Sequence, residues 1–493
     1  FFFHAEDGIR YSVASRGLGD VYKRQKEDKY TFHDMKTLWI GLILGLLSAT
    51  GPLRGKPNVV VIFIDDMGYG DIGPFGSQLN ETPHLDRMAR EGRRLTSFYS
   101  AAPVCTSSRA ALMTGCYPRR VGLARGSGHI VLFPGDPHGL NPEEHTMAEM
   151  FKSAGYVTGC FGKWHLGDQP AFLPTAQGFD TYFGIPYSND MWPALRRFQC
   201  PDLPILRDLK VIDLVKTMDD QAQLCQRFTD EAIKFIRRSR KRPFFVYLPH
   251  AFVHHPRLAR PRFMAKAADT TKAQIEEVDW SVGEILQCLR EENLAENTLV
   301  LFTSDNGGAR GCVNAPLRGG KGSVWEGGMR EPAVVWWPGT IPAGTSSDDV
   351  MTTMDLLPTF AKFAEAPARK DALPIDGKDV TTLLLGIKGA TSPHDYFFYH
   401  QADKLRAVRA GKWKCFREGQ LYDLSADIGE KQNVAPEHPG VVRRLQDAMD
   451  DFDAEMKTML RPVGFVENSR TLVPRAGVDG EEAYRPALSL KRR

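Results

Sequence analysis

The sequence predicts an α/β fold, in which helices cover both faces of a large mixed, mostly parallel sheet. A small C-terminal antiparallel sheet with one helix is expected to follow this domain. The first observation is a set of continuous apolar runs, such as NVVVIFI at 58–64, which are typical of strands buried on both faces. The second is that helical patterns separate these runs along the chain. The third is a change after residue 393 to short strand-like runs and a single amphipathic helix.

Each element follows from a local pattern, taken in chain order. The large sheet is expected to contain strands at 58–64, 156–161, 244–248, 298–302 and 333–337. Helical patterns predict helices at 83–91, 146–154, 221–238, 271–290 and 355–364. Because strands alternate with helices, we expect parallel pairing with helices on both faces. The small sheet is expected to contain 396–399, 404–410, 413–417 and 420–423, with a helix at 441–459.

Length and composition bound the class of protein. The chain has 493 residues, of which 42% are hydrophobic, which excludes a disordered protein. The net charge of +3 argues against nucleic acid or anionic membrane as a partner, and eight thinly spread cysteines do not resemble a disulfide scaffold. We expect a catalytic domain at 56–392, a small α+β subdomain at 393–462 and a loose tail at 463–493.

The N-terminal region has the features of a targeting signal. Residues 35–51 combine a short positive region, an apolar run and small residues, which is the pattern of a secretory signal peptide. The run is shorter than the roughly 20 residues needed to span a bilayer, so we expect an exported, periplasmic or secreted protein without a stable membrane anchor. Residues 1–34 are interpreted as a non-native or untranslated leader and are excluded from the fold.

The segment Cys105-Thr106-Ser107-Ser108-Arg109 is the strongest indication of function. Helix-favouring residues begin here, so Cys105 is expected at a helix N-terminus, where positive potential favours anionic forms of the thiol and anionic ligands. Arg109 would lie one helical turn later on the same face, placed to hold a doubly charged tetrahedral anion. An isolated segment of this kind is more often a buried cysteine that caps a helix.

Acidic side chains follow two of the expected strands. Asp65 and Asp66 come directly after the first strand, and Asp305 and Asn306 come after the strand at 298–302. In open α/β sheets, ligands bind beyond the carboxyl ends of the strands. An all-oxygen, anionic cluster suits a hard divalent cation, calcium before magnesium. Either pair alone would be typical of a turn or a helix cap.

Basic side chains follow the other strands. Lys163 and His165 come after the strand at 156–161, and Lys321 lies in the glycine-rich stretch 317–328. Three histidines within six residues follow the strand at 244–248, and they cannot all be catalytic. The combination predicts a receptor for a dianionic tetrahedral ester, sulfate or phosphate, with histidine as acid and base.

Together these motifs closely resemble those of the type I sulfatases, the formylglycine-dependent, arylsulfatase-like members of the alkaline phosphatase superfamily. The resemblance covers about residues 56–459. It rests on the Cys105 segment continued to residue 118 and on PNV at 57–59, DDMGYGD at 65–71, GKWH at 162–165, SDNG at 304–307 and GKGS at 320–323.

The resemblance implies hydrolysis of sulfate esters. Cys105 would be converted to formylglycine (3-oxoalanine) by a formylglycine-generating maturase. The hydrated aldehyde would attack sulfur, displace the alcohol and later release sulfate. Calcium, with magnesium as the second choice, would be held by residues that match the family's ligands: Asp65, Asp66, Asp305, Asn306 and the formylglycine at 105.

The resemblance also implies roles for the basic residues. Arg109 would stabilise the hydrated aldehyde, and Lys163 and Lys321 would bind the sulfate oxygens. Ser188 resembles a family position that contacts the diol.

The same resemblance assigns the histidines. His165 would orient and deprotonate the diol. His254 fits the family's His-x-Pro position, so it would bind substrate and protonate the leaving oxygen. His250 is the second choice for that role.

One residue departs from the family pattern. The third residue of the Cys105 segment is usually proline, sometimes alanine, and here it is Ser107. The resemblance implies that the maturase reads the segment in extended form, which proline favours, so serine is expected either to reduce conversion or to require a maturase that tolerates it.

Two alternatives stand beside the sulfatase interpretation. A phosphodiesterase or phosphonate hydrolase of the same superfamily would share the metal site, although a two-metal phosphatase needs more His and Asp ligands. An impaired sulfated-glycan binding protein would result if Cys105 stayed unmodified. The leading expectation is an enzyme that acts on sulfated carbohydrates or aryl sulfates.

Overall fold

The structure of the protein is a computed structural model that describes residues 55–195, 199–368 and 371–487. The expected signal peptide at 35–51 and the leader at 1–34 lie outside the described residues. All described residues belong to one unit of the chain. The domain boundaries expected within that unit, after residues 392 and 462, stay predictions.

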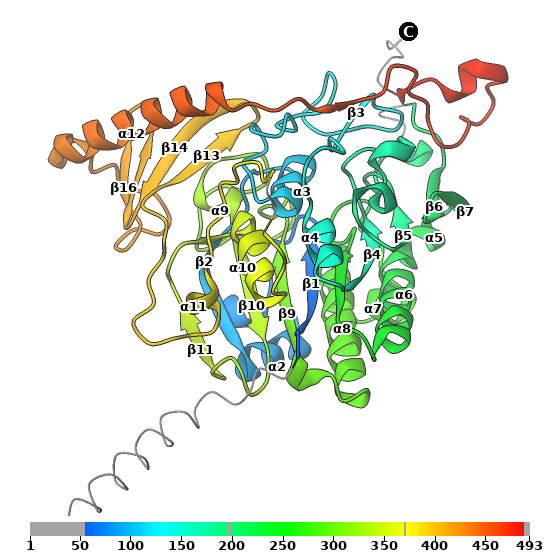
Figure 1. Ribbon diagram of the computed structural model, residues 1–493, viewed down its shortest axis with the longest axis horizontal. Helices are drawn as coiled ribbons and strands as arrows, with labels where there is room; N and C mark the ends of the chain where they lie inside the picture. Colours follow the sequence, from blue (N-terminus) through cyan, green and yellow to red (C-terminus); the bar gives the residue numbers. More distant parts are fainter. Residues whose placement is uncertain (1–54, 196–198, 369–370, 488–493) are drawn as a thin grey trace, which may run out of the picture. The chain divides into compact units, whose positions relative to one another are not determined.

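Parallel strands form the centre of an 11-stranded sheet (Figure 1). β1 pairs in parallel with β8 and β9, and β4 pairs in parallel with β8 and β5. All five expected strands are present, and the four parallel ones among them are buried along nearly their whole length, which explains their apolar runs. The bounds are β1 (Asn58–Ile64), β4 (Val157–Lys163), β5 (Thr181–Ile185), β8 (Phe244–Pro249) and β9 (Thr298–Ser304).

β10 (Arg330–Trp336) corrects one expectation, because it is antiparallel. It pairs antiparallel with β9 and with β2 (Arg93–Tyr99). The apolar run indicates that the strand is buried on both faces. An interior strand is buried in this way whether it pairs parallel or antiparallel, so the run does not reveal the direction. The chain returns from β9 through a long loop instead of a crossover helix, and this loop carries several candidate site residues.

The outer strands were not predicted from the sequence. They are short: the buried apolar run of β6 has four residues and includes a proline, and β7 is mostly exposed. Their bounds are β6 (Leu203–Arg207), β7 (Lys210–Val215), β11 (Thr345–Ser347) and β12 (Met351–Thr352).

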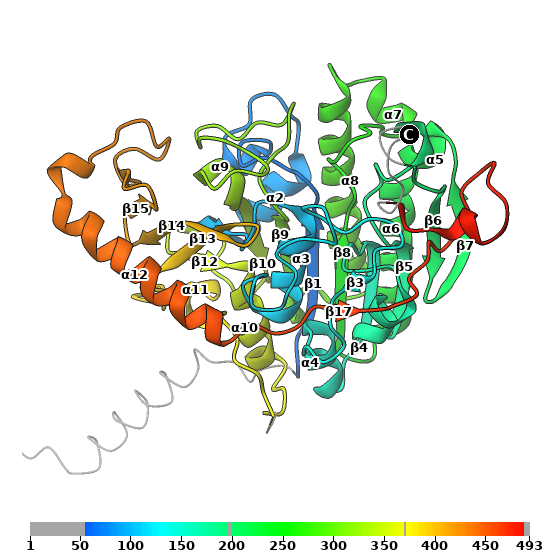
Figure 2. The same cartoon turned by 90° about the horizontal axis from the view of Figure 1, so that it is seen from above.

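Helices cover both faces of the large sheet, as Figure 2 shows, so the predicted sandwich is confirmed. One apolar core joins the sheet to α2 (Pro83–Glu91), α6 (Leu224–Ser239) and α8 (Thr270–Glu291). The other joins it to α3 (Cys105–Thr114), α4 (Met147–Ser153) and α10 (Leu356–Phe363). The helix expected at 221–238 is interrupted, because the short α5 (Met218–Ala222) precedes α6.

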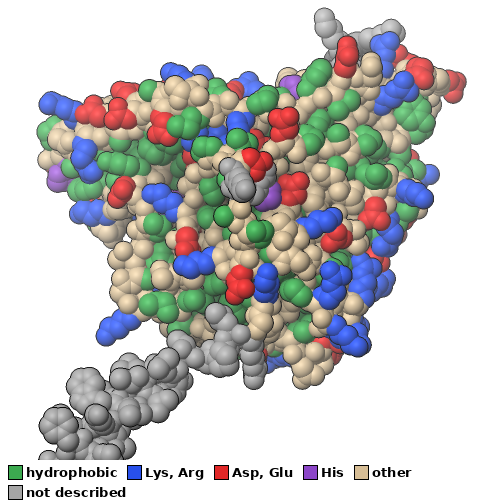
Figure 3. Space-filling model, viewed as in Figure 1, with side chains coloured by type: hydrophobic (Ala, Val, Ile, Leu, Met, Phe, Trp, Pro, Cys, Tyr) green, Lys and Arg blue, Asp and Glu red, His purple; other side chains and the backbone are tan. Residues whose placement is uncertain are grey.

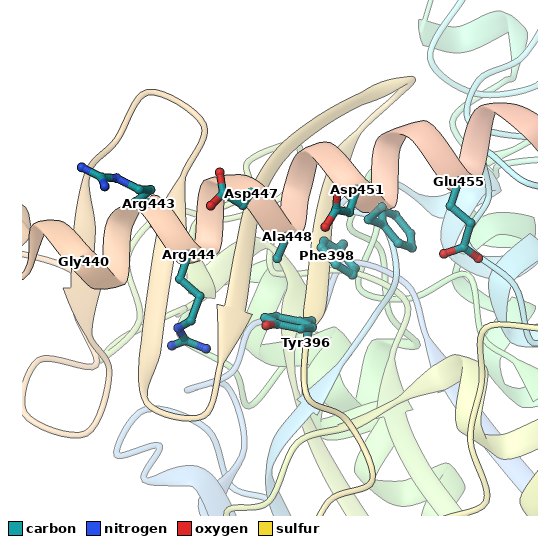
Figure 4. A pocket seen from close by; sticks show the side chains of 10 residues that line it. Tyr396, Phe398, Gly440, Arg443, Arg444, Asp447, Ala448, Asp451 and Glu455 are labelled. Carbon is teal, nitrogen blue, oxygen red and sulfur yellow. The ribbon is translucent and has the colours of Figure 1, made fainter. Parts of the chain in front are cut away.

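The C-terminal sheet and helix are confirmed. Four antiparallel strands pack against one helix and, through a third apolar core, against the large domain. Figure 4 shows an open groove between this helix and the first strand, lined by residues that include Tyr396, Phe398 and Arg444. The elements are β13 (Phe397–Gln401), β14 (Lys404–Ala410), β15 (Trp413–Phe416), β16 (Leu421–Asp423) and α12 (Pro439–Thr458).

The segment after α12 is not loose, and for residues 463–487 that prediction is wrong. β17 (Gly464–Phe465) pairs with β3 (His138–Gly139). Further along, Thr471 and Ala487 are buried and donate backbone hydrogen bonds to Tyr484 and Pro134. Backbone pairing, which leaves little trace in side-chain composition, fixes this segment.

The surface agrees with the small net charge. Acidic and basic side chains are interspersed over the face in Figure 3, with a group of basic side chains in the region of α6. Across the described ranges, we find no helix with the length and apolar character needed to cross a membrane. All eight cysteines lie in these ranges, and none forms a disulfide.

Candidate active site

The candidate site lies beyond the carboxyl ends of β1, β4, β8 and β9, where the strand-end rule predicts it. The backbone of Asp65 is fixed by hydrogen bonds to the loop after β8, including one from Asp65 N to Phe252 O at 2.9 Å. Asp66 follows with a left-handed φ of 64°, and its N–H donates to Asp305 Oδ1 at 3.2 Å. The sharp turn therefore brings both strand ends into one cluster.

Four acidic groups converge there. One oxygen each of Asp65, Asp66 and Asp305 and the Sγ of Cys105 all lie within 4.8 Å of one another, and all four residues are buried. Asn306 Nδ2 donates to Asp66 Oδ1 at 2.8 Å, whereas Asn306 Oδ1 is buried without a partner among the described residues. An unpaired amide oxygen beside three carboxylates is the donor set of a hard divalent cation.

Cys105 begins α3 and lies inside this cluster. Its Sγ is 3.3 Å from Asp65 Oδ1 and 3.4 Å from Lys321 Nζ. The sequence predicted that the helix N-terminus would favour the anionic thiol, and this is wrong for the unmodified residue. Burial, reinforced by the Asp65 carboxylate, raises the pKa of the Cys105 thiol far above its ordinary range.

Arg109 is fully buried one turn after Cys105. Its Nε and Nη2 donate to Asp305 Oδ2 at 3.1 and 2.8 Å, and its Nη1 donates to Lys163 O at 2.9 Å. Burial and the neighbouring Asp65 carboxylate raise the pKa of Asp305 to about 7, although Arg109 opposes the shift. Arg109 thus ties α3 to the ends of β4 and β9.

Two lysines lie on opposite sides of the cluster. Lys163, the last residue of β4, donates to Asp65 and also to Ser188 Oγ at 3.0 Å. Lys321 Nζ lies 2.7 and 2.8 Å from the two oxygens of Asp66. Burial alone would raise the pKa of Asp65, but the nearby cations, with Lys163 the strongest, hold it well below its usual range. The site therefore holds an anionic cluster next to two lysine ammonium groups that suit a sulfate or phosphate group.

Two of the predicted histidines reach the site. His254 Nε2 lies 3.6 Å from Asp66 Oδ2. His165 is buried with its Nε2 3.0 Å from Leu132 O, and its Nδ1 has no partner among the described residues. Burial and the charge of Lys163 hold the pKa of His165 well below 6.5, so the ring is neutral. Because Nε2 donates to the Leu132 carbonyl, the free lone pair lies on Nδ1.

His250 lies elsewhere. Its Nε2 is 2.9 Å from Ser281 Oγ on α8, and its ring lies against Phe228 on α6. It belongs to the apolar layer on one face of the sheet, so the structure separates it from the candidate site.

Sequence reasoning missed Asp190, which lies next to the histidine pair at 254 and 255. Asp190 Oδ2 lies 3.4 Å from His255 Nε2, and the rings of His254 and His255 stack with centroids 4.4 Å apart. Asp190 follows β5, so the strand-end rule that found Asp65 would have found it. The buried Glu331 was also missed; it accepts a hydrogen bond from Ser100 Oγ at 3.1 Å.

Ser107, which departs from the family pattern, is buried in the first turn of α3. Its Oγ donates to Ala124 O at 3.1 Å. In the folded protein the hydroxyl is therefore satisfied and leaves the cluster undisturbed.

Comparison with known proteins places these features in context. The family model described as sulfatase matches residues 57–366, and that of the N-sulphoglucosamine sulphohydrolase C-terminal region matches 320–455. N-acetylgalactosamine-6-sulfatase of Canis lupus familiaris is 39% identical over 389 residues, which are 75% of this chain and 73% of that protein. Arylsulfatase A of Homo sapiens is 36% identical over 460 residues, 82% and 89% of the two chains.

A solved structure is similar over most of its length. The crystal structure of Ps i-CgsB in complex with k-i-k-neocarrahexaose has a TM-score of 0.71 and 29% identity, and the alignment covers 81% of this chain and 93% of that one.

Proposed function

The chain belongs to the sulfatase family, and on that premise we propose that it removes sulfate from sulfated carbohydrates through a formylglycine formed from Cys105. One observation carries the proposal: Cys105, three carboxylates, the Asn306 amide and two lysines meet in a single cluster. These groups suit a site in which a nucleophile, a cation and an anionic ester are brought together.

Calcium and formylglycine are proposed to supply the chemistry that the chain lacks. Hydrated formylglycine provides an oxygen nucleophile, and calcium draws charge from the ester oxygens. Asp65, Asp66, Asp305, Asn306 and residue 105 would hold the ion. The unpaired Oδ1 of Asn306 supports this fit, because a buried amide oxygen without a partner is costly unless something binds it.

The basic residues bind and orient the ester. Lys163 and Lys321 bind the sulfate oxygens from two sides, and Ser188, already bonded to Lys163, fixes the position of that ammonium group. Arg109 holds Asp305 and the end of β4 in place. These contacts neutralise the dianion and stabilise the charge that develops on its oxygens.

Two histidines move protons. His165, neutral and with a free Nδ1, takes the proton from residue 105. His254, near Asp66 at the open side of the site, gives a proton to the leaving oxygen. The proposed division of roles follows from their surroundings, because His165 is buried close to the Lys163 charge and His254 lies beside Asp66.

Carbohydrates are the proposed substrates. Support comes from the relatives, which include an N-acetylgalactosamine-6-sulfatase and a structure that contains a neocarrahexaose. We further propose that the chain is exported through the signal at 35–51 and meets a formylglycine-generating maturase. Aryl sulfates then serve as convenient probes of the same site.

The test compares esters that share the 4-nitrophenyl leaving group and differ in the acid: sulfate, phosphate or phosphonate. Protein coexpressed with a formylglycine-generating enzyme is assayed with 4-nitrophenyl sulfate, 4-nitrophenyl phosphate and a 4-nitrophenyl phosphonate, with Cys105→Ala as control. We expect the sulfate to have the highest kcat/KM and the variant to be inactive. Faster cleavage of the phosphonate would favour the phosphonate hydrolase alternative, and sulfate binding without turnover would favour the binding protein.

A further inference from the structure

The loop that carries Lys321 is held by the C-terminal sheet. We call residues 317–326 the Lys321 loop, and Tyr399, Gln401, Lys414 and Glu430 the anchor residues. We propose that the anchor residues position Lys321 for binding the sulfate group, so that the C-terminal sheet sets the affinity of the active site. The inference rests on the proposed function, because it concerns the same anion site.

The Lys321 loop contains one tight turn around Lys321, in which Ser323 N and Oγ donate to Gly320 O at 3.0 and 2.8 Å. Gly319 and Gly322 adopt left-handed φ values of 79° and 84°, and the glycines on both sides of Lys321 have no side chains to pack. Two backbone bonds connect the centre of the loop to the large domain: Gly322 N to Pro103 O at 2.9 Å and Lys321 N to Gly308 O at 3.2 Å. This turn and these two bonds leave the two ends of a glycine-rich loop to be held by the elements packed against them.

Lys414 is the central anchor residue. It is fully buried on β15, and its Nζ lies 2.8 Å from Val324 O, 2.9 Å from Glu326 Oε1 and 2.8 Å from Glu430 Oε1. A buried ammonium between two carboxylates is held in place, because any displacement would leave a charge unpaired. It therefore fixes the C-terminal half of the Lys321 loop.

The other anchor residues hold the loop at further points. Gln401 Nε2 donates to Gly322 O at 2.7 Å, next to Lys321 itself. Tyr399 OH donates to Glu326 Oε1 at 2.7 Å. Glu430 accepts from Glu326 N at 2.7 Å through Oε2, and its carbonyl accepts from Arg318 Nη1 at 2.8 Å. Contacts thus lie on both sides of Lys321.

Aromatic packing adds to these polar contacts. Trp325 of the loop lies 4.4 Å from the ring of Phe416 and 5.8 Å from that of Tyr422, both on the C-terminal sheet. The guanidinium of Arg318 lies 3.6 Å from the Trp325 ring. The loop is therefore clamped to the sheet from residue 318 to residue 326.

The anchor residues act at a distance from the chemistry. Within the described residues, their bonds to the loop reach its backbone and the side chains of Arg318 and Glu326, and none reaches Asp66 or Cys105. The Lys321 ammonium alone makes those contacts, at 2.7–2.8 Å from Asp66 and 3.4 Å from Cys105 Sγ. Because a shift of about 1 Å at such a contact can cost about a hundredfold in rate, small changes at the anchor residues should be measurable.

Two variants test the proposal in the matured, full-length protein. Gln401→Ala removes one exposed contact to the loop and leaves no buried charge, whereas Lys414→Met removes the central ammonium. Lys404→Ala and Lys412→Met are the controls: Lys404 is exposed, and Lys412 pairs with Asp423 within the C-terminal sheet. The readouts are inhibition by inorganic sulfate, kcat and KM for 4-nitrophenyl sulfate, and the thermal unfolding midpoint.

For Gln401→Ala we expect sulfate inhibition about fivefold weaker and KM raised in parallel, as for the loss of one hydrogen bond worth about 1 kcal/mol. The unfolding midpoint should fall by no more than about 2 °C. Lys414→Met should weaken sulfate inhibition further. The controls should match the wild type. Sulfate inhibition within twofold of wild type in Gln401→Ala would overturn the inference, even if Lys414→Met failed to fold. A wild-type protein that neither binds sulfate nor cleaves the ester would instead refute the proposed function.

Discussion

His254 and His250 lie four residues apart in the segment after β8, yet their surroundings differ. His254 faces the Asp66 carboxylate at the entrance, whereas His250 is bonded to Ser281 beneath the sheet. Burial lowers the pKa of His250 to about 3, so it stays neutral in the folded protein. Only His254 is placed to give a proton to a leaving group.

Substitution should separate the two histidines. His254→Gln is expected to lower kcat by about a hundredfold for a sugar sulfate, whose leaving oxygen needs a proton, and much less for 4-nitrophenyl sulfate. His250→Gln should leave both rates near wild type and lower the unfolding midpoint. Steady-state kinetics on both esters measures this, and equal losses with the two esters in His254→Gln would contradict the assigned role.

Arg109 gives a second prediction, about stability. Its guanidinium makes two bonds to Asp305 and one to Lys163 O without access to solvent, a fork that lysine cannot reproduce. Arg109→Lys is expected to lower the free energy of unfolding by about 3 kcal/mol, because it leaves buried polar groups unpaired. Urea denaturation tests this, with Arg443→Lys at an exposed position of α12 as the control. A loss below about 1 kcal/mol would show that the site tolerates a simpler cation.

The clustering of site residues could be predicted where the residues lie at the ends of recognised strands. Asp65, Asp305 and Lys163 lie together because parallel strands end at the same edge of the sheet. The same rule applies to Asp190, but this residue was missed because its strand, β5, was not recognised in the sequence. The pKa of the Cys105 thiol could not be predicted, because its direction depends on burial and on a carboxylate 40 residues away in the chain.

At the scale of elements, α8 caps α2. Asp279 of α8 accepts backbone hydrogen bonds from Leu85 at 2.8 Å and His84 at 3.2 Å, in the first turn of α2. Burial raises the pKa of Asp279 from 3.8 to about 7, and nearby Asp86 adds to the shift. The folded protein therefore retains a proton that the unfolded chain releases.

This linkage predicts a dependence of stability on pH. Between pH about 4 and about 7 the folded state binds more protons at Asp279 than the unfolded state, so its contribution to the free energy of unfolding falls as pH rises. The fall is at most about 4 kcal/mol, at about 1.4 kcal/mol per pKa unit. In Asp279→Asn, the difference between the urea midpoints at pH 4.5 and pH 7 should be smaller than in the wild type. An unchanged difference would contradict this prediction.

Elements were predictable where burial or amphipathicity was strong. β1 and α2 match their expected bounds, because an interior strand and a helix with one apolar face leave clear patterns. The direction of β10 was not predictable from its apolar run, since strand direction depends on the connection. Exposed outer strands such as β7 were missed because their pairing relies on the backbone.

At the scale of the whole molecule, the metal site should couple to stability. Asp65, Asp66 and Asp305 come from strand ends far apart in the chain, so an ion between them binds only the folded state. Calcium is expected to raise the unfolding midpoint by a few degrees, since a ligand at a hundred times its Kd adds about 2.7 kcal/mol. A chelator should reverse this increase in the unfolding midpoint, and calcium should raise the midpoint more than magnesium does.

Asn306→Ala is the matched variant for that measurement. It removes the unpaired amide oxygen and keeps all three carboxylates, so most of the calcium shift should disappear. Differential scanning calorimetry with and without calcium measures both proteins. Equal calcium shifts in variant and wild type would exclude Asn306 as a ligand.

Long-range packing was the least predictable level. The segment 463–487 was expected to be loose, yet β17 pairs with β3 and Ala487 joins an apolar core. Likewise, Lys414 and Glu326 give no sign in the sequence of a shared, buried ion pair. Pairings between residues separated by tens of positions leave no local pattern from which they could be read.

The state of Cys105 tests the central claim most directly. Peptide mass spectrometry of the fragment containing Cys105, after coexpression with a formylglycine-generating enzyme, reads that state without any substrate, and Ser107→Pro serves as the variant with the usual family residue. Formylglycine at position 105 in the wild-type chain is the predicted result. A thiol that persists in both chains, while the same maturase converts an established sulfatase, would contradict it.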